Sequence, residues 1–340
     1  MDKTALADVA KKLVVDKKGI FAADWSVGSA DKHFSKNGIP LGEEERRNYR
    51  QMLFATPGLE EYISGVILHE ETARQKTDKG LSFPKFLLEK GITPGVRVDE
   101  GYEKLESSPK EQVTKGIDTL EKRLLEAKSL GVEFAKWRAP FFVDEVRPSK
   151  EAIEENSNLL AQYAYLCQKN GIVPIVEPEV LMDGNHTNAK CEAVTTEILK
   201  IVFEKLEEKE IYFEGMILKP NMILPGKDSP VEPVTKEVGH ATIRTLKNSI
   251  SKNVSGVAFL SGGQSPTQAT QNLNEIVKVA EDVPWQLTFS FARALQYPAI
   301  EIYKGKKENI PAAQSALLKR AKMNSLARQG LYESFMEDEK

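Results

Sequence analysis

Short apolar runs rich in β-branched and aromatic residues alternate with longer segments of helical periodicity along the whole chain. Eight such runs predict strands, because enough chain separates each from the next for a crossover helix. They cover residues 19–24, 65–69, 94–99, 133–139, 173–179, 215–221, 257–263 and 285–291. Alternation of strand and helix over the full length predicts a parallel sheet.

The segments between these runs carry helix signals. Helices are expected over residues 4–18, 111–130, 149–170, 235–251 and 311–328, with a C-terminal tail continuing to 340. Gly131 and Gly171 directly follow two of the periodic stretches, as glycine does where helices end. Ser265, Pro266 and Gln268 have the spacing of a capping box with proline in the first helical position.

The order of these elements favours one fold over its nearest alternative. Eight strand–helix units without a linker or composition step predict a single α/β domain over residues 1–340, a (β/α)₈ TIM barrel. A doubly wound open sheet is the second possibility. Such a sheet usually opens with a glycine-rich nucleotide-binding turn, and the first turn, at residues 22–26, has none.

Composition and charge limit the classes of function that the chain can have. The chain has 340 residues, 41% hydrophobic and 29% charged, with a net charge of −3, as in ordinary soluble proteins. Because acidic and basic residues are mixed along the chain, we expect no basic surface that would bind nucleic acid or an anionic membrane. The N-terminus lacks a signal-peptide core, and no run has the roughly 20 apolar residues of a membrane span. Two cysteines, Cys167 and Cys191, predict free thiols and a cytoplasmic protein.

Polar residues stand at the carboxyl ends of most predicted strands, where barrel enzymes carry their active sites. They are Asp24, Arg97, Lys136, Arg138, Glu177, Glu179, Lys219, Ser261, Gly262, Gly263, Ser290 and Arg293. Residues two apart share one face of a strand, so Lys136 with Arg138, and Glu177 with Glu179, are expected to point into the barrel. On the same ground Lys219 and Asn221 should share a face, with Leu218 on the other.

Two interpretations of these charges compete. A single Lys–Glu pair in a barrel is more often structural than catalytic. Several charges at one mouth favour function, because buried ion pairs seldom add much stability. A lysine crowded by a second cation loses its proton more readily, and its amine can attack a ketone while nearby carboxylates move protons. The sequence therefore predicts carbonyl chemistry at a lysine.

A phosphate site is the second chemical signal. The loops after strands seven and eight are the usual phosphate-binding place of this barrel, and they carry Ser261-Gly262-Gly263 and Arg293. Glycines let backbone N–H groups approach an anion, and an arginine can clamp it. The four histidines are scattered without metal-ligand spacing, so neither a metal nor another cofactor is expected.

The same segments resemble the class I (Schiff-base) fructose-bisphosphate aldolase family, and the motifs run in family order over nearly the whole chain. They are IFAAD at 20–24, GVIL at 65–68, KWR at 136–138, VEPE at 176–179, LKPNM at 218–222, LSGGQ at 260–264 and LTFS at 287–290. The resemblance implies metal-independent, reversible cleavage of fructose 1,6-bisphosphate to dihydroxyacetone phosphate and glyceraldehyde 3-phosphate, in glycolysis or gluconeogenesis. It also implies a homotetramer.

The resemblance further implies roles for individual residues. Lys219 would form the Schiff base, and Glu177, assisted by Glu179, would be the acid/base of imine formation. Asp24, with Lys136 nearby, would handle the hydroxyl proton during carbon–carbon cleavage. Ser261, the Gly262 and Gly263 N–H groups and Arg293 would hold the phosphate of the dihydroxyacetone half, beside Ser290. Ser26, Ser29 and Arg97 would hold the second phosphate, with Arg138 lining the site.

Four features depart from the family pattern. Trp25 stands in place of a glutamate, Arg97 in place of a lysine and Ala292 in place of a glycine, and the chain lacks the terminal tyrosine of many relatives, its last being Tyr332. An arginine keeps the charge of a lysine but not its shape. Trp25 and Arg97 bear on the second phosphate, so two alternatives stay open: a Schiff-base aldolase that prefers a sugar monophosphate, and an inactive scaffold.

Overall fold

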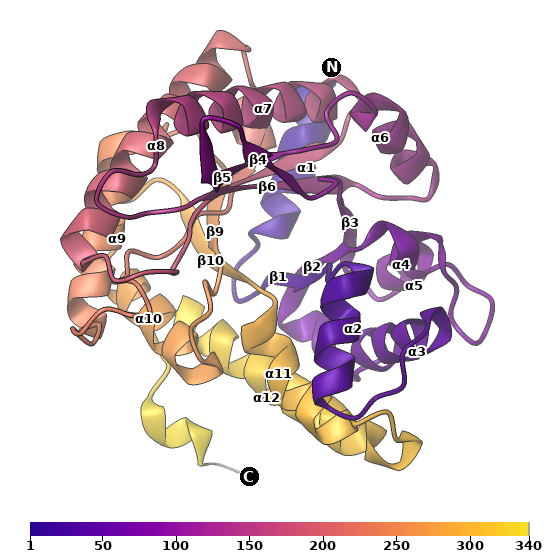
Figure 1. Cartoon of the computed structure of the whole chain (residues 1–340). Helices are drawn as coiled ribbons and strands as arrows, with labels where there is room; N and C mark the ends of the chain where they lie inside the picture. Colours follow the sequence, from indigo (N-terminus) through magenta and orange to yellow (C-terminus); the bar gives the residue numbers. More distant parts are fainter. Residues whose placement is uncertain (339–340) are drawn as a thin grey trace.

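Eight parallel strands close into a barrel with helices around it in the computed structural model, which describes residues 1–338 (Figure 1). The strands are β1 (Gly19–Ala23), β2 (Ile63–Leu68), β3 (Thr93–Arg97), β6 (Phe134–Phe141), β7 (Val173–Val180), β8 (Ile217–Leu218), β9 (Gly256–Phe259) and β10 (Gln286–Phe291). They pair in this order, and β10 returns to β1. The predicted TIM barrel is confirmed, and the open sheet is excluded.

Helices form the outer ring. They are α1 (Lys3–Leu13), α2 (Val27–Lys36), α3 (Glu43–Phe54), α4 (Glu70–Arg74), α5 (Phe83–Glu89), α6 (Leu120–Ser129), α7 (Lys150–Lys169), α8 (Asn188–Glu208), α9 (Thr235–Ser249), α10 (Pro266–Lys278), α11 (Arg293–Tyr303) and α12 (Ile310–Arg328). Ser149 and Ser265 cap α7 and α10 by accepting a bond from the backbone N–H three residues on. Within residues 1–338, no helix combines the length and apolarity needed to cross a membrane.

Side-chain alternation along the strands divides the core into two layers. Inside the barrel lie residues such as Ile20, Ile175 and Ile217, which pack with one another. Their neighbours in sequence face the helices instead, and Trp137 stacks on Tyr163 of α7 with ring centroids 5.7 Å apart. Alternate residues of each strand therefore point into the barrel. Near the carboxyl ends of the strands, these inward-pointing side chains reach the open mouth of the barrel.

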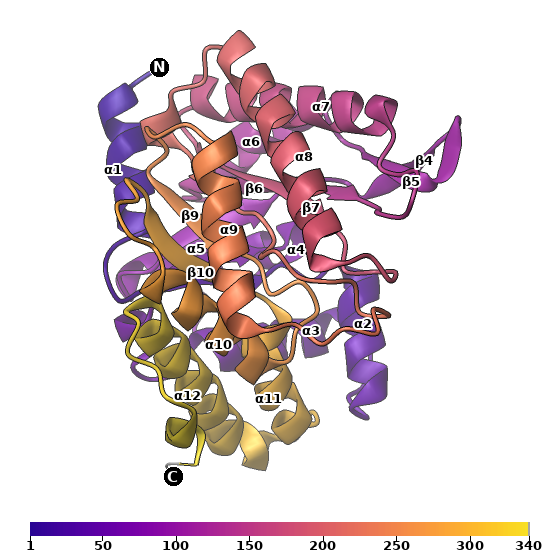
Figure 2. The same ribbon diagram turned by 90° about the vertical axis from the view of Figure 1, so that its left-hand side faces the viewer.

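Helix α1 closes the amino end of the barrel. Its apolar face, with Leu6, Ala10 and Leu13, packs in the same cluster as the inward-facing strand residues. In Figure 2, α1 lies at one end of the molecule, while α2 and the β4–β5 hairpin lie at the other. The barrel therefore opens at one end only, the carboxyl ends of its strands.

Residues 111–130 were expected to form one helix, and this prediction was wrong. The chain forms an antiparallel hairpin of β4 (Tyr102–Leu105) and β5 (Ser108–Thr114), and α6 begins only at Leu120. Val113, Ile117 and Leu120 have helical spacing, but Glu111 and Val113 are buried while Gln112 is exposed, which is the alternation of a strand. Gly116, with a φ of 105°, separates the hairpin from the helix.

Both ends of the chain differ in detail from expectation. Helix α1 stops at Leu13 rather than near 18, with Val14 as its C-cap, and Lys17 adopts a φ of 65°, which no right-handed helix permits. At the other end, the buried Tyr332 donates a 2.9 Å hydrogen bond to Glu337, whose carboxylate also pairs with Arg320 at 2.6 Å. The last two residues of the expected 311–340 segment lie outside the described part of the chain.

The interior layer predicts a stability effect at Gly95. A Cβ there would lie 2.2 Å from the ring of Phe134, which is fully buried in the barrel. Gly95→Ala should therefore destabilise the protein by about 1–3 kcal/mol, as overpacking does, which lowers the urea midpoint. Gly28→Ala is the matched control, because nothing lies within 4 Å and a helical alanine gains about 0.5–1 kcal/mol. Equal midpoints for the two variants would contradict the packing argument.

Candidate active site

A cavity of about 430 Å³ opens at the carboxyl ends of the barrel strands. Thirteen of the fourteen residues predicted for the site line it: Asp24, Ser26, Ser29, Arg97, Lys136, Arg138, Glu177, Glu179, Lys219, Ser261, Gly262, Ser290 and Arg293. The fourteenth, Gly263, lines an adjoining cavity of about 240 Å³, and a Cβ on it would lie 3.6 Å from Arg293 Nη2. The fold thus brings together residues more than 250 positions apart in the chain.

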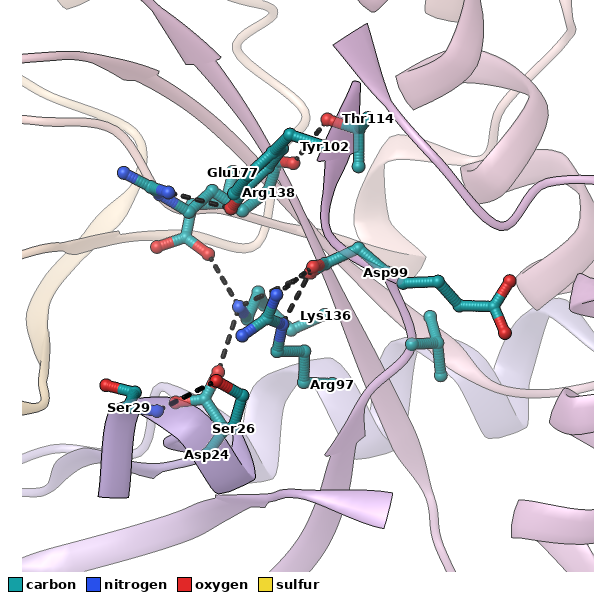
Figure 3. Close-up of polar contacts among 12 residues, drawn as sticks. Asp24, Ser26, Ser29, Arg97, Asp99, Tyr102, Thr114, Lys136, Arg138 and Glu177 are labelled. Carbon is teal, nitrogen blue, oxygen red and sulfur yellow. Dashed lines mark hydrogen bonds and ion pairs between the residues drawn. The ribbon is translucent and has the colours of Figure 1, made fainter. Parts of the chain in front are cut away.

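Two lysines share one carboxylate at the centre of the cavity. Lys219 Nζ lies 3.0 Å from Glu177 Oε1, and Lys136 Nζ lies 3.2 Å from Glu177 Oε2. The ammonium of Lys136 also lies 2.9 Å from Asp24 Oδ2, as Figure 3 shows. All four side chains are at least nine-tenths buried. An amine, a bridging carboxylate and a second carboxylate therefore stand within one proton-transfer network.

Burial and charge compete at these groups. Burial alone would raise the pKa of Asp24, but Lys136, Lys219 and Arg97 together hold it well below its usual range. Burial would likewise lower the pKa of Lys136, and the carboxylates of Asp24, Glu177 and Asp99 raise it instead. Both groups are charged at neutral pH, so Asp24 is an available base and Lys136 a fixed cation.

Backbone contacts hold the strands that present these groups. Arg50 of α3 donates to the carbonyls of Ala23 and Trp25 at 3.0 and 3.1 Å, on either side of Asp24. The hydroxyl of Tyr163 lies 2.7 Å from the carbonyl of Ala135 and 3.2 Å from that of Ile175, at the strands that carry Lys136 and Glu177. These helices therefore fix the spacing of the catalytic candidates from outside the barrel.

Lys219 and Asn221 do not share a face, contrary to expectation. Strand β8 ends at Leu218, one residue before Lys219, and Pro220 follows. Asn221 turns toward α8, where its Nδ2 lies 3.4 Å from Thr195 Oγ1, and its Oδ1 accepts the N–H of Val180 at 3.0 Å. Alternation holds only in extended backbone, so it fails where the strand stops. Of these two residues, Lys219 lines the cavity and Asn221 does not.

Two of the three guanidinium groups that line the cavity, those of Arg97 and Arg138, have a carboxylate partner. Arg97 Nε donates to Asp99 Oδ1 at 2.7 Å, and the side chain of Asp99 has no exposed surface. Arg138 Nε donates to Glu179 in the same way. Asp99 also lies 3.7 Å from Lys136 Nζ. The pairs orient the guanidinium groups and partly neutralise them.

The loops after β9 and β10 form a site with several unused donors. Gly262 and Gly263 adopt φ values of 56° and 86°, a backbone that glycine favours. Helix α11 begins at Arg293 beside them, so its first N–H groups lack helical partners. The buried hydroxyl of Ser290 has no hydrogen-bond partner within residues 1–338. Such an arrangement suits a phosphate.

Sequence reasoning missed one whole face of the cavity. Lys32, His33 and Lys36 of α2 line it with Ser29, at spacings of three, four and seven residues. That spacing is one face of a helix, a signal that was present in the sequence. The His33 ring lies 4.2 Å from that of Trp25, and burial together with Arg293 lowers the pKa of His33. Tyr102 and Tyr297 also line the cavity and were not predicted.

The departures from the family pattern have plain structural settings. Trp25 is buried against Tyr49, with nearly parallel rings 6.1 Å apart. Ala292 has a φ of −103°, which is not the left-handed conformation that favours glycine. Cys167 and Cys191 are buried free thiols. Among residues 1–338, no three His, Cys, Asp or Glu side chains are placed to hold a metal ion.

Comparison with known proteins agrees with the site. Residues 5–340 match the family described as "Glycolytic: Fructose-bisphosphate aldolase class-I". Fructose-bisphosphate aldolase C of Homo sapiens is 45% identical over 337 residues, 99% of this chain and 93% of the relative. Fructose-bisphosphate aldolase 2 of Caenorhabditis elegans is 45% identical over 330 residues, 97% of this chain and 90% of the relative.

A solved structure has the same fold over almost the whole length. It is fructose-bisphosphate aldolase from Plasmodium falciparum, in a complex with TRAP and a small-molecule inhibitor. The two superpose with a TM-score of 0.95 at 42% identity, covering 98% of this chain and 96% of the other. A cavity with a lysine–glutamate–lysine centre and this degree of similarity lead to one conclusion: the chain belongs to the class I fructose-bisphosphate aldolase family and has fructose-bisphosphate aldolase activity.

Proposed function

We propose that Lys219 is the nucleophile of this aldolase. Its amine adds to the ketone of the open-chain sugar, and loss of water gives a protonated imine. The imine accepts the electron pair of the adjacent carbon–carbon bond when that bond breaks, so no metal is required. The observation that carries the proposal is the 3.0 Å contact between Lys219 Nζ and Glu177 inside a polar cavity.

Glu177 moves the protons of imine formation. Its Oε1 faces Lys219, so it can give a proton to the departing hydroxyl of the carbinolamine and take one from the water that later hydrolyses the imine. Its Oε2 faces Lys136, which keeps the carboxylate in place through both steps. Glu179, paired with Arg138, assists from the next inward position of the same strand.

Asp24 takes the hydroxyl proton when the carbon–carbon bond breaks. The proton leaves as the hydroxyl becomes the carbonyl of the aldehyde product. Asp24 is suited to this because the cations around it keep it ionised, although it is buried. Lys136, 2.9 Å away, stabilises the carboxylate and orients it toward the cavity.

The two phosphates occupy opposite ends of the cavity. Ser261, Gly262, Gly263 and Arg293 hold the one on the dihydroxyacetone half, with Ser290 at their side. Ser26, Ser29 and Arg97 hold the second, with Arg138 lining the site. We assign fructose 1,6-bisphosphate as the substrate; a higher kcat/KM for fructose 1-phosphate would replace this assignment with the monophosphate alternative.

The remaining assignments rest on the family. The reaction serves glycolysis or gluconeogenesis in the cytoplasm, the protein is a homotetramer, and it needs neither nucleic acid nor a membrane. Two buried free thiols agree with a reducing compartment. Sedimentation of the purified protein and fractionation of its cells would test the assembly and the location.

Covalent trapping tests the nucleophile. Borohydride reduction with dihydroxyacetone phosphate and EDTA should leave an adduct on the Lys219 peptide, read by mass spectrometry. Lys219→Met should give no adduct and no cleavage, because no amine remains to form the imine. Lys169→Met, at an exposed lysine of α7, is the matched control and should trap as the unaltered protein does. Trapping on another lysine would reassign the nucleophile.

Two carboxylate substitutions separate the proposed steps. Asp24→Asn should lower kcat for cleavage by about 10²- to 10⁴-fold, yet still trap dihydroxyacetone phosphate, because imine formation does not use Asp24. Glu177→Gln should slow the trapping itself. Stopped-flow kinetics and timed reduction would measure the two rates. The assignment of roles fails if Asp24→Asn slows trapping as much as cleavage.

The depressed pKa of Asp24 also predicts a pH dependence of stability. In the unfolded chain this group titrates near 3.9, so its contribution is complete above that pH and is lost as the pH falls toward the folded value. The urea midpoint of the unaltered protein should exceed that of Asp24→Asn at pH 7, and the gap should narrow below about pH 4. Asp118→Asn, at an exposed carboxylate, is the control. A gap that stays constant would contradict the argument.

A further inference from the structure

Tyr102 stands on the wall between two cavities. It begins β4, in the hairpin that follows β3, and its half-buried side chain reaches the main cavity. It also lines a second cavity of about 540 Å³, together with Ser26, Arg97 and Arg138. These four residues are the ones that the two cavities share. Tyr102 therefore faces the end of the site that we assign to the second phosphate.

The hydroxyl of Tyr102 has a proton to give. Arg138 Nη1 donates to it at 2.7 Å, which uses the oxygen as an acceptor (Figure 3). Burial raises the pKa of Tyr102 and outweighs the effect of Arg138, so the phenol is protonated at neutral pH. Within residues 1–338, this O–H donates no assigned hydrogen bond. A ligand oxygen in the cavity is thus a free partner for it.

The neighbouring cations make a neutral donor valuable here. Arg97 is engaged by Asp99, and Arg138 by Glu179, so each guanidinium has fewer N–H groups free than an unpaired arginine would have. A phosphate at this wall must also approach the buried Asp99 carboxylate. A phenol adds a hydrogen bond to a phosphate oxygen without a further charge that would need a counter-ion.

We propose that Tyr102 is a substrate-binding, specificity-determining residue, whose O–H donates to the phosphate of the aldehyde half of fructose 1,6-bisphosphate. The proposal rests on the proposed function, since it uses the orientation assigned there. It identifies a contact from the hairpin after β3, beyond the residues of strands and loops already assigned to this phosphate.

A purely structural role is the competing explanation. The ring of Tyr102 lies under Arg138, with 5.5 Å from the guanidinium carbon to the ring centroid, so it could serve only to hold that arginine. Thr114, opposite Tyr102 in the hairpin, holds the same residue differently, donating its hydroxyl to the carbonyl of Arg138 at 2.8 Å. Thr114→Val therefore loosens Arg138 without removing a donor from the cavity.

The test compares two substrates in three variants. Kinetics on fructose 1,6-bisphosphate and fructose 1-phosphate would be measured for Tyr102→Phe, Thr114→Val and the control Tyr165→Phe, at an exposed tyrosine of α7. In Tyr102→Phe, the ratio of kcat/KM for bisphosphate over monophosphate should fall about tenfold or more, because a hydrogen bond to a charged group is lost. The loss should appear mainly in KM for the bisphosphate. The other two variants should keep the ratio.

Three outcomes of these kinetics would overturn the proposal. An unchanged ratio in Tyr102→Phe means that the phenol does not contact the phosphate. An equal loss on both substrates, or a fall in the ratio with Thr114→Val as well, means that Tyr102 acts only through Arg138. Borohydride trapping of dihydroxyacetone phosphate on Lys219 in Tyr102→Phe confirms that the variant is folded. Failure of that trapping in the unaltered protein would instead refute the proposed function.

Discussion

The buried ammonium group of Lys136 holds the site together, because three carboxylates from three different strand ends approach it. Asp24, Glu177 and Asp99 lie 2.9, 3.2 and 3.7 Å from its nitrogen, and Glu177 continues to Lys219. Isolated charges in such a place would cost several kcal/mol each. They are tolerated because every one has a partner of opposite sign. The same balance decides the protonation states on which the chemistry depends: a buried aspartate that stays ionised, and a cation that keeps its proton.

The barrel makes this arrangement possible because the inward-facing and outward-facing residues of each strand have different roles. On β6, Lys136 and Arg138 face the mouth while Trp137 packs against α7. The outward residue anchors the strand to apolar surroundings, and the inward residues are free to be polar. Helices then hold the strand ends from behind, as Arg50 does on both sides of Asp24. A side chain to which we assign a catalytic role is thus positioned by apolar packing that it does not touch.

Much of this could be predicted from the sequence, and the failures have identifiable causes. The inward face of β6 and β7 followed from a period of two, and the strand-end rule located the charged cavity residues on the strands but not those of α2. Asn221 was placed wrongly because the strand ended before it. The hairpin of β4 and β5 was missed because Val113 also has helical spacing to Ile117 and Leu120. Tyr102 could not be found at all: its importance lies in its distance from Arg138, which is 36 residues away in the chain.

Helix α1 has a consequence for the order in which the protein can be completed. Its apolar face is buried by residues from strands as far along the chain as Ala258, and Arg328 binds the carbonyl of Val14 at 2.6 Å just after the helix ends. Helix α1 therefore leaves the ribosome before the strands that bury it and is among the last elements to be fully packed. Until β9 and α12 have emerged, Leu6, Ala10 and Leu13 have no complete surface to cover them. The helix that closes the barrel thus precedes in the chain the strands that it closes.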